Sequence, residues 1–237
     1  KMTEKGNIIV DEKVLEGINR PEAKAVARYM MLQKRVAQID SWLVAVKDDG
    51  RVHGRVITNG AVTGRMTHQS PNMAQVPAVS APFGTECRQC WTVDEGNVLV
   101  GIDASGLELR MLAHYMDDED YTNEILNGDI HTANQRAAGL ETRPLAKTFI
   151  YAFLYGAGDA KIGAIVGGNS HIGRRLKERF LSNTPALERL RGDTNGEAES
   201  GVLVGLDGRK LRVRSQHAAL NTKLQGAGAC VMKQALV

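Results

Sequence analysis

The chain has 237 residues, of which 43% are hydrophobic and 24% are charged, so it can bury one sizeable core or a core with an attached lobe. Its formal net charge is only +3, and no stretch approaches the roughly 18 consecutive apolar residues of a membrane-spanning helix. Residues 1–11 lack the apolar run of a signal peptide, so we expect a soluble cytoplasmic protein without a membrane partner.

The first half of the chain predicts one long helix followed by strands and loops. Residues 21–46 have the apolar spacing of a helix, and Pro21 can occupy its first turn. Residues 52–57 and 98–102 have the apolar character of strands, and glycines and prolines interrupt the stretch between them. A helix is expected after the second strand, over residues 105–116, with Ser105 as its cap.

The second half predicts helices around one hairpin. Pro144 lies where the first turn of a helix tolerates it, and Gly156 lies where that helix would end. Another helix is expected over residues 174–191, where Gly192 would end it, and a hairpin is expected over residues 201–214, with Asp207-Gly208 as its turn. A last helix is expected over residues 217–237; it ends on apolar residues without a cap, which suggests a truncated chain.

One row of side chains on the helix around Pro144 can bind a nucleotide. Arg143, Lys147, Tyr151 and Tyr155 recur every four residues and therefore share one face of a helix. The helix would pack through its other faces, which carry Phe149, Ile150, Phe153 and Leu154. The cations lie at the amino end, where the helix dipole also favours anions, and the rings follow. This order suits a nucleoside triphosphate, although an ordinary amphipathic helix with two surface cations would have the same spacing.

An acidic residue at the end of a predicted strand is a candidate metal ligand. The apolar residues 98–102 lead to Asp103, and a carboxylate held rigidly at a strand end suits magnesium. Glu108 follows on the next predicted helix, close enough to line the same pocket. Asp103 could equally do no more than help to begin that helix.

Two further stretches, together with the uneven distribution of charge, suit a nucleic acid. The loop over residues 63–77 is rich in groups that donate hydrogen bonds to phosphates, sugars and base edges. His217, Asn221 and Gln225 recur every four residues, and such a row could contact a minor groove. Residues 161–191 contain seven Lys or Arg and two acidic residues. Each of these stretches, taken alone, could also be a solvated polar surface.

Together these segments resemble the family A DNA polymerases, the DNA polymerase I kind, and most closely the replicative enzymes of short-tailed bacteriophages. The matching segments, in chain order, are Thr63–Pro77, Asp103–Arg110, Gly128–Thr132, Arg143–Gly156 and Leu206–Lys233. They correspond to the primer-template loop, the first catalytic motif, a segment whose histidine faces the triphosphate, the fingers helix and the approach to the third motif. Their combined order is far more specific than any one of them.

The resemblance implies a role for each matching residue in catalysis or nucleotide binding. Asp103 would bind two Mg²⁺ ions with help from the Ala104 carbonyl, and Glu108 would block a ribose 2′-hydroxyl and so select deoxynucleotides. Lys147 would contact the phosphates and protonate the leaving pyrophosphate. The other expected deoxynucleotide contacts are His131, Arg143, Tyr151 and Tyr155.

The resemblance also implies partners. Primer-template DNA would be contacted by Arg65, Asn72, Gln75, His217, Asn221 and Gln225, and His217 stands where many relatives have Arg. Deoxynucleoside triphosphates would be the substrates, a processivity factor is a possible further partner, and a phage-encoded protein would work in the cytoplasm of a bacterial host.

One part of the family pattern is missing. The family places a second catalytic aspartate in a His-Asp pair, and none of the six histidines here is followed by Asp. A single carboxylate cannot hold two divalent ions of like charge close together. We therefore expect this chain by itself to extend primers poorly or not at all.

The expected fold is α+β, an incomplete polymerase palm with an antiparallel sheet and a helical fingers subdomain. Its expected parts are a thumb-base and palm entry (1–50), the first part of the palm (51–118), the fingers (119–200) and the returning palm (201–237). A non-catalytic nucleic-acid-binding module derived from a polymerase is the alternative function. A single-subunit RNA polymerase is a third possibility, but Glu108 argues against it because an enzyme that uses ribose needs no gate.

Overall fold

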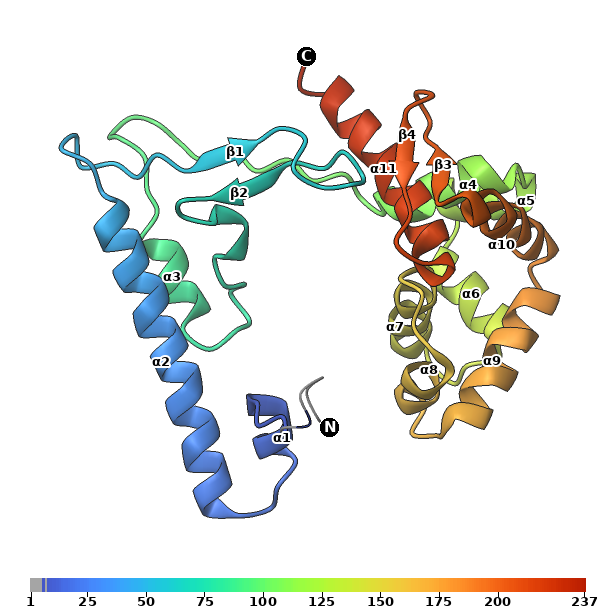
Figure 1. Cartoon of the computed structure of the whole chain (residues 1–237), viewed down its shortest axis with the longest axis horizontal. Helices are drawn as coiled ribbons and strands as arrows, with labels where there is room; N and C mark the ends of the chain where they lie inside the picture. Colours follow the sequence, from blue (N-terminus) through green and yellow to red (C-terminus); the bar gives the residue numbers. More distant parts are fainter. Residues whose placement is uncertain (1–5, 7) are drawn as a thin grey trace. The chain divides into compact units, whose positions relative to one another are not determined.

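The computed structural model describes residue 6 and residues 8–237 (Figure 1). The chain divides into two compact units. The first comprises Lys1–Ile57 and Thr67–Gly101, and the second comprises Thr58–Met66 and Ile102–Val237. Helices predominate among the described residues, whose strands form two separate two-stranded antiparallel sheets, so the predicted α+β class is confirmed.

The first unit is organised around one long helix. Its elements are α1 (Glu12–Glu16), α2 (Pro21–Ala45), β1 (Arg55–Ile57), β2 (Thr67–Gln69), η1 (Met73–Gln75) and α3 (Gly84–Gln89). The predicted long helix is confirmed, with Pro21 in its first turn. Proline is tolerated there because N–H groups of the first turn do not donate to hydrogen bonds within the helix. Trp42 of α2 is buried and packs edge-on against Trp91, with the ring centroids 5.1 Å apart.

The strand prediction for this unit was only partly right. The stretch expected as one strand over residues 52–57 pairs as a strand only over Arg55–Ile57, where Val56 lies opposite His68 of β2. The interrupted stretch that follows contains β2, η1 and α3, which its glycines and prolines did not indicate.

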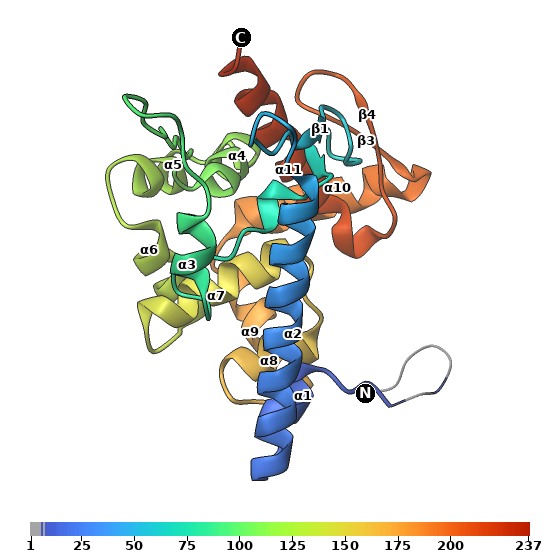
Figure 2. The same cartoon turned by 90° about the vertical axis from the view of Figure 1, so that its left-hand side faces the viewer.

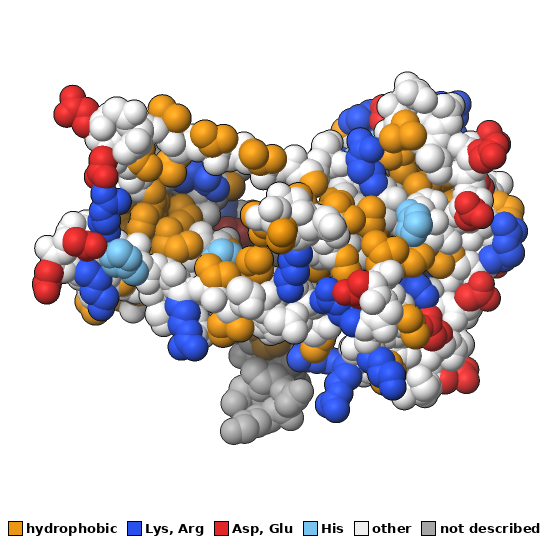
Figure 3. Space-filling model, turned by 90° about the horizontal axis from the view of Figure 1, so that it is seen from above, with side chains coloured by type: hydrophobic (Ala, Val, Ile, Leu, Met, Phe, Trp, Pro, Cys, Tyr) orange, Lys and Arg blue, Asp and Glu red, His pale blue; other side chains and the backbone are white. Residues whose placement is uncertain are grey.

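The second predicted strand, residues 98–102, is absent. Val98, Leu99, Val100 and Ile102 lie in an irregular segment and are between 70% and 89% exposed. Hydrophobic side chains, orange in Figure 3, reach the surface in several places on the face that it shows. A strand needs a neighbour for its backbone N–H and C=O groups, and within the described residues neither sheet includes this segment.

The second unit is mainly helical. Its elements are α4 (Leu107–Met116), α5 (Glu119–Leu126), α6 (Ile130–Ala138), α7 (Arg143–Leu154), α8 (Asp159–Ile165), α9 (Ser170–Ser182), α10 (Pro185–Glu197), η2 (Ala198–Ser200), β3 (Val202–Val204), β4 (Lys210–Arg212), η3 (Gln216–Ala218) and α11 (Ala219–Gln234). Helices α6–α9 pack at one end of the unit, and α4, α10 and α11 lie with the β3–β4 hairpin at the other (Figures 1 and 2). Leu112, Phe149, Ile150, Ile162 and Phe180 are completely buried between them.

Two predictions for this unit are confirmed. Helix α7 begins at Arg143 and ends before Gly156, whose positive φ of 71° suits the end of a helix. The hairpin also forms as expected: Leu203 lies opposite Leu211, and Gly208 occupies the turn with a φ of 78°. Among the described residues, no helix combines the length and apolarity needed to cross a bilayer.

Several helix boundaries differ from the prediction, including those of α11, which was expected over residues 217–237. Ser105 does not cap α4, because the helix begins at Leu107 after Gly106, which has a left-handed backbone. The helix expected over residues 174–191 is two helices, since Pro185 begins a new one and a residue before proline is pushed into an extended conformation. Gly192, expected to end that helix, lies within α10, where packing of the buried face offsets its poor helix propensity.

Candidate nucleotide-binding site

Helix α7 presents the predicted row on its accessible side. Thr142 caps the helix by accepting a hydrogen bond from the Leu145 N–H at 3.4 Å. Phe149, Ile150, Phe153 and Leu154 are buried on the other faces, as expected. Arg143, Lys147 and Tyr155 are exposed and Tyr151 is half-buried. The row is therefore available to a ligand and is not part of the interior.

Arg143 is held by a carboxylate at the start of α6. Its Nε and Nη2 donate to the two oxygens of Asp129 at 2.6 Å and 3.1 Å. Asp129 also accepts from the His131 N–H at 3.1 Å and from the Thr132 hydroxyl at 2.8 Å. These bonds, led by those from Arg143, hold the pKa of the Asp129 carboxyl well below its usual range.

Asp129 is the member of this cluster that sequence reasoning missed. The signal was present, because an Asp directly before an apolar helix start is a typical N-cap and here it precedes His131 by two residues. Its second role, as partner of Arg143, depends on how α6 and α7 pack and could not be deduced from local sequence.

His131 lies beside the cationic end of the row. Its Nδ1 is buried and has no hydrogen-bond partner among the residues that the structure describes. Burial, and then the positive charges of Arg143 and Lys147, lower the pKa of His131 below its ordinary value. Its ring centroid is 6.2 Å from that of Tyr151. His131, Arg143, Lys147 and Tyr151 therefore form one group. An anion bound to this group would relieve the repulsion between its positive charges.

The two tyrosines and Glu108 form the other end of the group. The rings of Tyr151 and Tyr155 are stacked, with centroids 6.5 Å apart and planes 27° apart. Burial raises the pKa of the Tyr151 hydroxyl, and the negative charge of Glu108 raises it further. Glu108 of α4 therefore lies close enough to α7 to affect the ring expected to contact a nucleotide.

Arg65 reaches Glu108 from a loop that is distant in sequence. Its Nη2 is 3.6 Å from Glu108 Oε1, with the side chains 48% and 21% exposed respectively. Both residues belong to the second unit, because Thr58–Met66 pack with it. The structure thus brings together one predicted primer-template residue and the predicted gate.

Asp103 and Ala104 precede α4 in a segment without regular structure. Asp103 is exposed and Ala104 is half-buried. Magnesium takes several oxygen ligands, often including carboxylates. Within the part of the chain that the structure describes, no group of three or more His, Cys, Asp or Glu side chains is arranged to hold a metal ion. The exposed Asp103 carboxylate is an oxygen donor of the kind that such a site uses.

The remaining predicted DNA contacts are spread over both units. Asn72 and Gln75 lie in the first unit, where the Asn72 Oδ1 accepts from the Ala74 N–H at 3.1 Å and caps η1. In the second unit, Asn221 and Gln225 are half-buried on α11. His217 is not part of that helix as expected but lies exposed in η3, so the three residues do not form one helical row.

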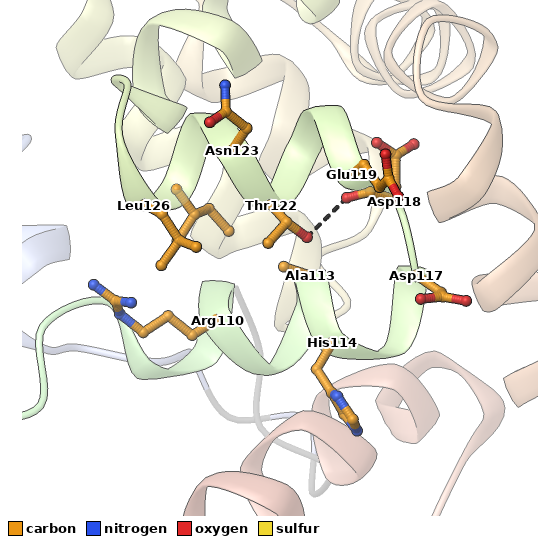
Figure 4. Close-up of a pocket in the computed structure, with 10 residues that line it drawn as sticks. Arg110, Ala113, His114, Asp117, Asp118, Glu119, Thr122, Asn123 and Leu126 are labelled. Carbon is orange, nitrogen blue, oxygen red and sulfur yellow. Dashed lines mark hydrogen bonds between the residues drawn. The ribbon is translucent and has the colours of Figure 1, made fainter.

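A separate hollow of about 550 Å³ lies between α4 and α5 (Figure 4). Its walls include Arg110, His114 and Asp117, and the Thr122 hydroxyl donates to the Asp118 carbonyl at 2.8 Å. None of the residues predicted for nucleotide or DNA binding is among those that line it. The candidate site is therefore the accessible face of α7 and not this hollow.

Comparison with known proteins gives consistent matches over the whole chain. The family model described as DNA polymerase family A matches residues 1–237. The DNA-directed DNA polymerases of Enterobacteria phage T3 and Escherichia phage T7 are each 49% identical to the chain over 269 aligned residues. A thermostable DNA polymerase I of Thermus aquaticus is 27% identical over 252 residues, which cover 94% of the chain and 30% of that relative.

A solved structure has the same fold. It is the POL domain of Pol1 from M. smegmatis in complex with DNA primer-template and dNTP, and it matches all of this chain with a TM-score of 0.84 and 22% sequence identity. The chain corresponds to 46% of that structure and to 38% of each of the two phage relatives, so it spans less than half of the proteins that it resembles.

Proposed function

Because the chain belongs to DNA polymerase family A, we propose that it supplies the nucleotide-binding part of the active site of a DNA-templated DNA polymerase that works in DNA replication. One observation carries the proposal. A row of two exposed cations and two stacked rings runs along α7, His131 lies at its cationic end, and the negative charge of Glu108 raises the pKa of Tyr151 in the row.

The triphosphate would lie at the cationic end. Arg143 and Lys147 would bind its oxygens, and His131 would add a hydrogen bond through the ring nitrogen that is not buried. The amino end of α7 adds its own preference for negative charge. In the free protein Asp129 neutralises Arg143, so a triphosphate would compete with this carboxylate for the guanidinium.

The sugar and base would lie further along the row. Tyr151 would stack against the incoming nucleotide, and Tyr155 would lie near the templating base. Glu108 would exclude a ribose 2′-hydroxyl. The effect of its charge on the pKa of Tyr151 supports a place for Glu108 near the sugar. Arg65, held 3.6 Å from Glu108, would link the gate to the primer-template.

In the reaction, the primer 3′-hydroxyl would lose its proton to solvent, and its oxygen would form a bond to the α-phosphorus of the bound deoxynucleotide. The bond from that phosphorus to its bridging oxygen would break, and Lys147 would give a proton to the departing pyrophosphate. Two Mg²⁺ ions, when bound, would activate the primer oxygen and stabilise the leaving charge. Asp103 and the Ala104 carbonyl would be ligands, and the His-Asp pair that adds a second aspartate in the family is not among these 237 residues.

Primer-template DNA would be contacted by Arg65, Asn72, Gln75, His217, Asn221 and Gln225. The exposure of Arg65 and His217 supports such contacts. Asn221 and Gln225 on α11 are half-buried, so their side-chain amides would contact only DNA that lies close to this helix. The division into thumb base, palm and fingers at residues 50, 118 and 200 remains part of this proposal.

Calorimetric titration of the chain with a deoxynucleoside triphosphate tests the proposal. Replacement of Lys147 by Ala removes a charged hydrogen-bond donor and should weaken binding by about tenfold or more. Lys161→Ala, which removes an exposed lysine from the next helix, is the matched control and should change little. Equal affinities for the wild-type chain and Lys147→Ala would refute the placement of the triphosphate.

Two further measurements separate the alternatives. A non-catalytic DNA-binding module would bind primer-template but no triphosphate. A polymerase site would prefer a deoxynucleotide over the matching ribonucleotide, and Glu108→Ala should reduce that preference. In a primer-extension assay we expect little synthesis by the 237-residue chain, and rapid magnesium-dependent extension would contradict the incomplete metal site.

A further inference from the structure

Arg209 connects three segments of the second unit. It follows the turn of the β3–β4 hairpin, where its Nε donates to both carboxylate oxygens of Asp207 at 2.9 Å and 2.7 Å. Its Nη2 lies 3.5 Å from the Cys230 sulfur on α11. The Arg209 hydrogen bonds lower the pKa of the Asp207 carboxyl to about 2, so this pair stays ionised at neutral pH.

The third contact of Arg209 is with the backbone of Gly64. A Cβ atom added to Gly64 would lie 2.2 Å from Arg209 Nη1, so the guanidinium occupies the space that any other residue would need. Gly64 has a φ of 77°, which favours glycine, and its N–H closes a turn by donating to the Ala61 carbonyl at 2.8 Å. Arg209 therefore covers the turn at its tightest point.

This turn ends at Arg65, the residue that reaches the predicted gate. The Ala61 N–H donates to the Arg65 carbonyl at 3.2 Å, so both ends of the turn are fixed to each other. Thr63 is buried, and its carbonyl lies 3.7 Å from the Cβ that Gly226 of α11 lacks. The turn is thus held from two sides, by α11 and by Arg209, while the Arg65 side chain remains directed at Glu108.

We propose that Arg209 is a positioning residue that locks the Thr63–Gly64–Arg65 turn, so that Arg65 holds Glu108 in place and the site discriminates between deoxyribose and ribose. The inference depends on the proposed role of Glu108 as a gate. Arginine suits the task because its planar fork carries several donors, so that Nε bonds to Asp207 while Nη1 occupies the space beside Gly64, which the single ammonium of a lysine cannot do.

Hydrogen exchange tests the lock without any nucleotide. Deuterium uptake is measured by mass spectrometry on peptides that cover residues 58–66 in the wild-type chain, in Arg209→Met and in Arg209→Lys. Both variants should exchange faster in this segment, by about threefold or more, while α7 peptides stay unchanged. Arg212→Met, which removes an exposed arginine from the same hairpin, is the control. Unchanged uptake in both Arg209 variants would overturn the lock.

Nucleotide binding tests the consequence. In titrations with dATP and ATP, Arg209→Met should reduce the preference for dATP by about threefold or more. If both arginines act through Glu108, the double variant Arg209→Met/Arg65→Met should lose no more of this preference than the more affected single variant. A preference that remains as in the wild-type chain would overturn the positioning role. If the wild-type chain binds neither nucleotide, the proposed function fails, and the exchange experiment still decides whether Arg209 locks the turn.

Discussion

The guanidinium of Arg143 and the carboxylate of Asp129 form a two-bonded ion pair, with N–O distances of 2.6 Å and 3.1 Å. The same carboxylate caps α6 through the His131 N–H. The Asp129 side chain therefore has two roles. It caps α6, and it pairs with the arginine that is expected to bind a phosphate. Removal of its charge without loss of the cap should separate the two roles.

Asp129→Asn should raise the affinity of the chain for a deoxynucleoside triphosphate by about twofold to fivefold. Asparagine is as good an N-cap as aspartate, so α6 should persist, while Arg143 loses its competing anion. Calorimetric titration measures the change. Asp118→Asn, the same substitution at the cap of α5, is the control. An unchanged or weaker affinity of Asp129→Asn would show that Arg143 does not bind the triphosphate.

Triphosphate binding should depend on pH through His131. Burial and the charges of Arg143 and Lys147 lower the pKa of His131 in the free protein, and a bound triphosphate should raise it. A proton is then taken up on binding, so affinity should increase as the pH falls between the bound-state pKa and the lowered pKa of the free protein.

The γ-phosphate also titrates in this pH range, so a pH dependence of the wild-type chain is not enough to identify His131. The affinity of His131→Asn is therefore measured as well, and it should depend less on pH than that of the wild type. Titrations between about pH 8 and pH 5.5 cover the ordinary imidazole value of about 6.5. His171→Asn, at an exposed position on α9, should behave as the wild type. Identical pH profiles for all three proteins would exclude His131 from the phosphate site.

Phe149→Ala should destabilise the chain by about 3–5 kcal/mol, because it leaves a cavity behind the nucleotide row. Phe149 is completely buried, and its ring meets that of Phe180 edge-on at 5.1 Å. Urea unfolding followed by circular dichroism measures the loss. Phe149→Leu keeps most of the volume and should cost clearly less. A loss below about 1 kcal/mol for the alanine variant would mean that this core is not packed as described.

Glu197→Gln should reduce stability at neutral pH but not in acid. The Glu197 Oε2 accepts from Lys223 Nζ at 2.7 Å, and both side chains are mostly buried. Burial alone would raise the pKa of Glu197, but the hydrogen bonds from Lys223 and the Val204 N–H outweigh it and lower the pKa. The pair therefore stabilises the fold above the unfolded-state value of about 4.3, and this stabilisation is lost as the pH falls through the lowered folded-state pKa.

Urea unfolding at pH 7 should show a loss of about 1–3 kcal/mol for Glu197→Gln, with a smaller difference from the wild type below about pH 4. Glu199→Gln, at an exposed position nearby, should be neutral at both pH values. A difference between Glu197→Gln and the wild type that is equally large in acid would show that the ion pair is not its source.

Local signals in the sequence were sufficient for the elements that depend on near neighbours. The amphipathic period and Pro144 predicted α7 and its buried face, and the Asp207-Gly208 turn predicted the hairpin, because turn and helix preferences act within a few residues. The order of the motifs also indicated the polymerase family, which the match over residues 1–237 confirms.

Contacts between distant segments decided the rest. Residues 98–102 are as apolar as a strand requires, yet they form none, because a strand exists only with a partner. Gly192 does not end a helix, because the packing of α10 outweighs its propensity. Asp129 on Arg143 and Arg209 over Gly64 are pairs that only the packing of α6 on α7, and of the hairpin on the loop, could bring together. The sequence by itself determined which local elements and which family to expect; the tertiary structure determined which side chains share a site, because burial and electrostatic contact depend on all neighbours in space.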